Sequence, residues 1–116
     1  MMSKTARSVT VGFAAAVAAA IATTSVACAQ DAEVAITVKD HHFAPAEAHA
    51  PANRPLSIKV KNLDAAAMEF ESVSLRVEKI VPAGGEGAVH VRPLAPGRYE
   101  FFDDFHQETR GTLVVQ

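Results

Sequence analysis

The chain of 116 residues has room for one small domain. Apolar residues make up 49% of it and charged residues 21%, a balance that is typical of soluble globular proteins. The formal net charge of −2 excludes a strongly cationic surface of the kind that binds nucleic acid. A single cysteine excludes a disulfide framework and every multi-cysteine metal site.

The first residues have the pattern of a secretory signal peptide. Lys4 and Arg7 give a positive start, residues 9–22 form an apolar run rich in alanine, and small residues follow. Ala27 and Ala29 form the A-x-A pattern that precedes a cleavage site. We therefore predict a signal peptide over residues 1–29, one domain over residues 30–116 and a periplasmic location.

Two other fates of this segment are open. Cys28 follows an alanine and could be acylated as in a lipoprotein, but Ser25 stands where a lipoprotein signal has a large aliphatic residue. The segment could also remain as a membrane anchor, although its apolar run is short and poor in leucine and isoleucine. The pattern favours cleavage over both.

The rest of the chain predicts an all-β domain. Residues 33–39 and 56–61 alternate between apolar and polar side chains, which is the period of a half-buried strand. Short strands separated by turn residues indicate a β-sandwich, and only Asp64–Met68 has a helical look. The predicted strands are Glu33–Lys39, Leu56–Lys61, Met68–Ser72, Leu75–Val81, Ala88–Val91, Arg98–Phe102 and Thr112–Val115.

One of these strands carries two carboxylates close together. If Phe70 points into the core, Met68 and Ser72 share its face, while Glu69 and Glu71 project from the other face. Carboxylates at positions i and i+2 of a strand lie about 6–7 Å apart. With a third ligand they could chelate a hard cation; alternatively, they are two ordinary solvated acids.

A second group of polar residues follows the predicted strand Arg98–Phe102. Asp103, Asp104, His106 and Glu108 lie close together in the sequence, among aromatic residues. Polar ligands on a loop with apolar surroundings are typical of metal sites. The alternative is a polar loop that caps the sandwich, with His106 hydrogen-bonded and structural.

The remaining histidines give a weaker signal. His41 and His42 follow the first predicted strand, and neighbouring side chains in an extended segment point to opposite sides. We expect at most one of this pair to face the same end of the domain as His106. His49 and His90 are expected to be ordinary strand or loop residues.

The whole predicted domain resembles the cupredoxins. Leu94–Phe101, a polar loop and Gly111–Val115 look like their C-terminal hairpin, and Phe43–Ala46, Asn53–Leu56 and Val60–Asp64 match their N-terminal strands. The resemblance implies a single-domain Greek-key β-sandwich.

Two shorter runs resemble a narrower group. Glu69–Ser72 and Phe101–His106 look like the corresponding runs of the EfeO-type cupredoxin-like family, and of similar periplasmic proteins of Ftr-type iron-uptake operons.

The blue-copper ligand set is largely missing from the matching positions. A blue-copper site has two histidines, a cysteine thiolate and a weak axial methionine. The resemblance places Met68 at the first histidine, Asp103 at the cysteine, His106 at the second histidine and Thr109 at the methionine. Without a thiolate, we expect no blue-copper electron carrier.

The remaining donors favour harder metals. Carboxylates with an imidazole suit Fe(III), Mn(II) or Cu(II) better than Cu(I). Carried over from the resemblance, the expected metal ligands are Glu69, Glu71, Asp103, Asp104 and His106, with Met68 as a weaker candidate because its thioether prefers Cu(I). The order of inward and outward positions suggests two overlapping groups, Met68, Asp103 and His106 in one, and Glu69, Glu71 and Asp104 or Glu108 in the other.

The resemblance implies a periplasmic protein that binds iron or copper and assists iron uptake through a membrane permease. A second periplasmic iron- or copper-binding protein is the other expected partner; no nucleic acid or small-molecule substrate is expected. The alternatives are a periplasmic copper chaperone and a metal-free interaction module. No catalytic motif is present, and ferroxidase activity would need an electron acceptor such as copper bound beside the iron.

Overall fold

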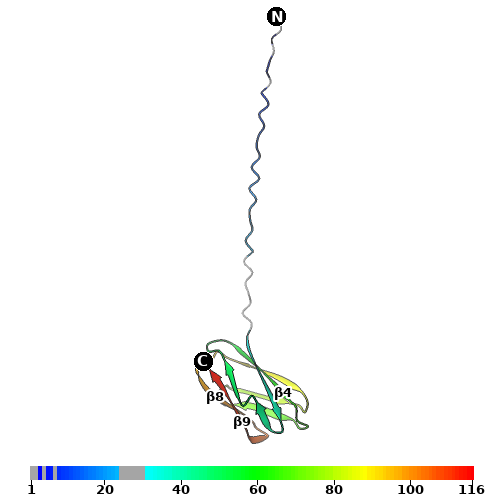
Figure 1. Ribbon diagram of the computed structural model, residues 1–116, viewed down its shortest axis with the longest axis vertical. Helices are drawn as coiled ribbons and strands as arrows, with labels where there is room; N and C mark the ends of the chain where they lie inside the picture. Colours follow the sequence, from blue (N-terminus) through cyan, green and yellow to red (C-terminus); the bar gives the residue numbers. More distant parts are fainter. Residues whose placement is uncertain (1–2, 4, 7, 24–30) are drawn as a thin grey trace.

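The computed structural model describes residues 3, 5–6, 8–23 and 31–116, and its folded part is a sandwich of two β-sheets (Figure 1). One sheet has the strand order β2-β1-β4-β7 and the other β3-β9-β8-β5-β6. The strands are β1 (Ala32–Lys39), β2 (His42–Ala44), β3 (Glu47–Ala50), β4 (Leu56–Asn62), β5 (Met68–Ser72), β6 (Val77–Val81), β7 (Glu86–Val91), β8 (Gly97–Asp103) and β9 (His106–Val115). The predicted all-β sandwich is therefore confirmed.

The alternating pattern of the sequence determines which faces are buried. Val34, Ile36 and Val38 of β1 point into the space between the sheets, and the apolar residues of β4 do the same. These two strands run parallel to each other, with Val34 beside Ile58. Each predicted strand corresponds to an observed one, with ends that differ by a few residues.

The structure differs from the prediction at three places. Strands β2 and β3 were not expected, because they have only three and four residues and the apolar residues of β3 are both alanine. Strand β9 begins at His106 rather than Thr112. The expected helical turn at Asp64–Met68 is wrong: residues 64–66 form a bend, and Met68 starts β5.

A buried asparagine explains the bend. The Asn62 side-chain amide donates to the carbonyl oxygens of Ala66 at 2.8 Å, Val81 at 3.3 Å and Pro82 at 3.2 Å. Its Oδ1 accepts the backbone N–H of Asp64 at 3.0 Å. The loop backbone is thus bonded by a side chain instead of by helical hydrogen bonds.

The predicted signal peptide is described only in part. Residues 8–23 are exposed and form no helix or strand, whereas the predicted cleavage site after Ala29 and the Cys28 side chain lie outside the described residues. In the described part of the chain, no helix has the length and apolar character needed to cross a membrane. The first strand begins at Ala32, two residues inside the predicted domain.

Three phenylalanines fill the middle of the core. The ring centroid of Phe43 lies 5.0 Å from that of Phe101 and 6.2 Å from that of Phe70, both in edge-on contact. Phe70 and Phe101 are 5.2 Å apart. A Cβ atom on Gly111 would lie only 2.4 Å from the Phe101 ring, so this glycine lets the ring pack directly against β9.

His41 and the predicted ligands Asp103, Asp104 and His106 lie at one end of the sandwich. Strands β1, β4 and β8 end there, and β2, β5 and β9 begin there. We call this the site end and define it by residues 40–41, 62–67 and 103–106.

Candidate metal centre

Asp103 is the buried polar residue at the centre of the site end. It ends β8 and is 1% exposed. Its Oδ1 accepts the backbone N–H groups of Glu69 and Phe105, each at 3.0 Å, and its Oδ2 lies 3.2 Å from His106 Nδ1. The register of β8 against β9 shifts between Phe102 and Asp103, directly before this carboxylate.

His41 reaches the same place from a distant part of the sequence. It is the second residue of the turn between β1 and β2, where Lys39 pairs with His42. Asp40 and His41 have φ angles of 50° and 59°, the pattern of a type I′ hairpin turn. This turn places the His41 ring against the His106 ring, with centroids 4.1 Å apart.

His41, Asp103 and His106 form a group that we call the triad. Each offers one ligand atom, and the three atoms lie within 4.8 Å of one another. Ligand atoms bound to one ion at about 2.1 Å are at most about 4.2 Å apart, so a small adjustment brings all three onto one ion. Two imidazoles and one carboxylate are a ligand set for divalent first-row metals.

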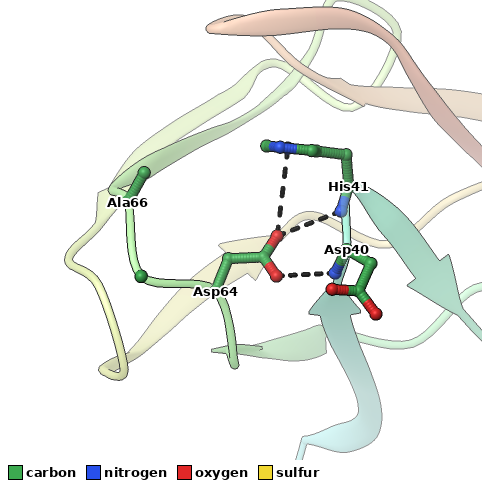
Figure 2. A pocket seen from close by; sticks show the side chains of 5 residues that line it. Asp40, His41, Asp64 and Ala66 are labelled. Atoms are coloured by element: carbon green, nitrogen blue, oxygen red, sulfur yellow. Dashed lines mark hydrogen bonds and ion pairs between the residues drawn. The ribbon is translucent and has the colours of Figure 1, made fainter.

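Asp64 supports His41 from the side of a shallow pocket of about 390 Å³ (Figure 2). Figure 2 shows the Asp64 carboxylate pointing at the turn, where its oxygens accept the N–H of Asp40 at 2.6 Å and of His41 at 3.1 Å. The Nδ1 atom of His41 lies 3.9 Å from Asp64 Oδ2. The His41 N–H is the main cause that lowers the pKa of Asp64 below its usual value, opposed by burial and helped by the Asp40 N–H.

Glu69, Glu71 and Asp104 form a second group, which we call the acidic cluster. Their ligand atoms also lie within 4.8 Å of one another. The Asp104 N–H donates to the Glu69 carbonyl at 2.9 Å, which brings the β8–β9 turn onto β5. Glu78 of β6 stands directly opposite Glu71 and adds a fourth carboxylate beside the cluster.

Crowding of negative charge changes the protonation of this cluster. A hydrogen bond that the protonated Glu69 carboxyl donates to Glu78, followed by burial and the charges of Glu78, Asp104 and Glu71, raises the pKa of Glu69 to about 7. Burial, and then the charges of Asp104 and Glu78, raise the pKa of Glu71. Carboxylates this close share protons unless a cation compensates their charge.

A family model for the cupredoxin-like domain matches residues 12–115. The chain belongs to the cupredoxin-like domain family. An uncharacterized protein of Rickettsia prowazekii (strain Madrid E) is 42% identical over 84 residues, which cover 72% of this chain and 67% of that protein.

Solved cupredoxin-like structures share the fold at low sequence identity. The metal-binding domain of the Streptococcus pneumoniae D39 Cu(I)-exporting P-type ATPase CopA, solved with Cu(I), has a TM-score of 0.63 and 16% identity, covering 72% of this chain and 84% of that one. A reduced Cu(I) form of an amicyanin variant has a TM-score of 0.60 and 14% identity, covering 75% and 85%. These likenesses show a cupredoxin-like fold.

At the site end, two positions that the resemblance assigns to the blue-copper cysteine and methionine hold oxygen-bearing side chains instead. Asp103 stands where the resemblance places the thiolate, and it is held by two backbone N–H groups. Thr109 stands where the resemblance places the axial methionine, and its hydroxyl donates to the His41 carbonyl at 2.7 Å. The hydroxyl is thus engaged by the backbone of a triad residue.

The predicted ligands fall into the two groups expected from their positions. Asp103 and His106 belong to the triad, and Glu69, Glu71 and Asp104 to the acidic cluster. Glu69 is only 7% exposed, so it is not an ordinary solvated acid. Met68 is 2% exposed and belongs to the hydrophobic core, and its role as a ligand stays a prediction.

Sequence reasoning did not select His41 over His42. The signal lay in the turn: a strand followed by Asp40-His41 and another strand favours a two-residue turn, and Asp is common at its first position. Glu78 was also missed, because its proximity to Glu71 depends on strand register. His49 and His90 are exposed and lie near Glu47 and Asp31 instead.

Proposed function

We propose that this protein binds an iron or copper ion at His41, Asp103 and His106 and handles that metal in the periplasm during iron uptake. The observation that carries the proposal is the convergence of these side chains, from two separate hairpins, at one end of a cupredoxin-like sandwich. The Asp103 carboxylate is buried, held by two backbone N–H groups and 3.2 Å from His106 Nδ1, so its position in the triad is fixed.

The ligand types favour particular oxidation states. Two imidazoles and a carboxylate suit Fe(II) and Cu(II), and a site with two histidines and one carboxylate is typical of non-haem Fe(II) proteins. In the described part of the chain no cysteine takes part in the triad, so the intense thiolate absorption of blue copper is not expected. The proposed role is therefore metal handling, not long-range electron transfer.

The acidic cluster supplies a second place for a metal with harder preferences. Oxygen ligands alone suit Fe(III) or Mn(II) better than copper. Asp103 and Asp104 are consecutive, so the two groups lie side by side on the β8–β9 hairpin. An ion could pass between them over a short distance.

Two observations support a role in iron uptake. The runs Glu69–Ser72 and Phe101–His106, which resemble EfeO-type proteins, contribute most residues of the two groups. The N-terminal signal pattern favours export to the compartment where such proteins work. The proposed partners are a membrane iron permease and a second periplasmic iron- or copper-binding protein.

A copper chaperone is the second candidate. It is favoured by the two imidazoles of the triad and by the structural similarity to proteins solved with Cu(I). A chaperone of this kind would retain Cu(I) and leave Fe(II) and Fe(III) unbound.

Metal retention tests these functions. The purified protein is offered Fe(II), Fe(III), Cu(II), Cu(I), Mn(II) and Zn(II) separately, desalted and assayed for bound metal. We expect one Fe(II) or Cu(II) ion per chain, lost in His41→Ala, Asp103→Ala and His106→Ala, whereas Fe(III) or Mn(II) held by the acidic cluster should remain. His90→Ala is the matched control, because His90 is also an exposed-face histidine 3.8 Å from an aspartate. Retention of Fe(II) and Cu(II) by all three triad variants overturns the proposed site.

Copper-assisted iron oxidation is tested separately. In that reaction Fe(II) gives one electron to Cu(II), which becomes Cu(I), and Fe(III) passes to the carboxylates. Copper-loaded protein should then oxidise Fe(II) faster than the same amount of free copper in buffer. Equal rates would exclude a ferroxidase role.

A further inference from the structure

The backbone of His41 is held by side chains that are not members of the triad. His41 is a non-glycine residue with a positive φ of 59°, and it follows another, Asp40, with a φ of 50°. Such turns usually contain asparagine or glycine, because other residues adopt this conformation at a cost. Hydrogen bonds from other parts of the chain can offset this cost and keep the turn in its observed conformation.

Asp64 bonds the N–H side of the turn. Its two carboxylate oxygens accept the N–H groups of Asp40 and His41, as Figure 2 shows. Asp64 is itself fixed, because its own N–H donates to Oδ1 of the buried Asn62. The turn at the end of β1 is thus tied to the loop that follows β4.

Thr109 bonds the carbonyl side of the same residue. Its side chain is buried, and its hydroxyl donates to the His41 carbonyl at 2.7 Å. Thr109 lies on β9, the strand that also begins with His106. The hydroxyl therefore joins the hairpin of one triad histidine to the strand of the other.

We propose that Asp64 and Thr109 are positioning residues that hold the His41 ring in place to bind metal. Together they bond both backbone groups of His41, Asp64 from the loop after β4 and Thr109 from β9 of the other sheet. Thr109 acts on the site through His41 and does not touch the metal. This inference rests on the proposed metal-binding function of the triad.

The test compares hydroxyl variants that differ by single atoms. Thr109→Val removes the hydroxyl and keeps the shape, whereas Thr109→Ser keeps the hydroxyl. Thr37→Val is the matched control, because the Thr37 hydroxyl also donates to a carbonyl of the β1–β2 hairpin, that of Ala44 at 3.1 Å, but away from the turn. Supporting groups around metal ligands typically change affinity by about 10–100-fold.

Cu(II) is the probe, read by affinity and by electron paramagnetic resonance. We expect Thr109→Val and Asp64→Ala to bind Cu(II) at least about tenfold more weakly and to lose nitrogen coupling from one histidine. Thr109→Ser and Thr37→Val should match the wild type. If Thr109→Val and Asp64→Ala both keep the wild-type spectrum and affinity, the positioning role is wrong.

A metal-free measurement separates this inference from the function on which it rests. Amide hydrogen exchange at Asp40 and His41 should accelerate in Asp64→Ala and stay slow in Thr37→Val, because Asp64 accepts both N–H groups. If the wild type shows no histidine coupling to Cu(II), the proposed function fails even where exchange behaves as expected. Unchanged exchange in Asp64→Ala would instead overturn the positioning role.

Discussion

Asp103 accepts the backbone N–H of Glu69 at 3.0 Å, so the central carboxylate of the triad is bonded to the main chain of an acidic-cluster residue. The next residue, Asp104, donates its own N–H to the Glu69 carbonyl at 2.9 Å. Glu69 is therefore bonded on both sides by consecutive residues of the β8–β9 hairpin. The triad and the acidic cluster are thus joined through the main chain of Glu69.

The two N–H groups on Asp103 predict a difference between two substitutions. Asp103→Ala leaves the buried N–H of Glu69 and the part-buried N–H of Phe105 without an acceptor, which we expect to cost about 1–3 kcal/mol of unfolding free energy. Asp103→Asn keeps an acceptor oxygen and should cost less, while still lowering metal affinity. Urea unfolding of the metal-free proteins measures both. Equal losses for the two variants would contradict the assigned hydrogen bonds.

The raised pKa of Glu69 predicts that metal-free protein becomes less stable as pH rises. Between about 4.5, the ordinary value, and about 7, the folded state holds a proton that the unfolded state has released. Stability from this group is therefore complete below about pH 4.5 and is lost as pH rises through 7; Glu71 acts in the same direction. Thermal unfolding at pH 5, 6, 7 and 8 measures the slope, which Glu69→Gln should flatten.

Removing the fourth carboxylate should relieve this repulsion. Glu78→Gln removes a negative charge opposite Glu71 and beside Glu69, so we expect a higher melting temperature at pH 8. At pH 5 the gain should shrink, because Glu69 is then protonated. Glu86→Gln on β7 is the control for the general effect of lower net charge. An equal gain in that control would show that Glu78 has no special role.

Gly111 should not tolerate a side chain. A Cβ atom there would lie 2.4 and 2.5 Å from atoms of the buried Phe101 ring, so Gly111→Ala must displace the core aromatic cluster. We expect a loss of about 1–3 kcal/mol in unfolding free energy. Gly97→Ala is the control on the same hairpin, because a Cβ atom there would come no nearer than 3.6 Å to its closest neighbour, the Tyr99 ring. Denaturant titration of both variants makes the comparison.

The sequence predicted the sandwich because its strands carry a strong alternating pattern. The shared side of Glu69 and Glu71 followed from that alternation, and so did the inward direction of Asp103 at the end of β8. Alternation says nothing about which strands meet at a turn, so His41 and Glu78 could not be assigned to the two groups. The bend at residues 64–66 was missed because a long-range bond from buried Asn62 replaced local helical bonding.

The direction of β1 has a consequence for attachment. The domain begins at Ala32, and β1 runs from there for eight residues, about 26 Å, before the turn that holds His41. Strand β9 leaves the site end at His106 and finishes at Val115, so the last strand returns to the opposite end, where Figure 1 marks the C-terminus. A link through either terminus, whether a lipid, a surface or a fused protein, would leave the triad facing outward. The triad therefore lies at the end of the sandwich opposite the start of β1 and the end of β9.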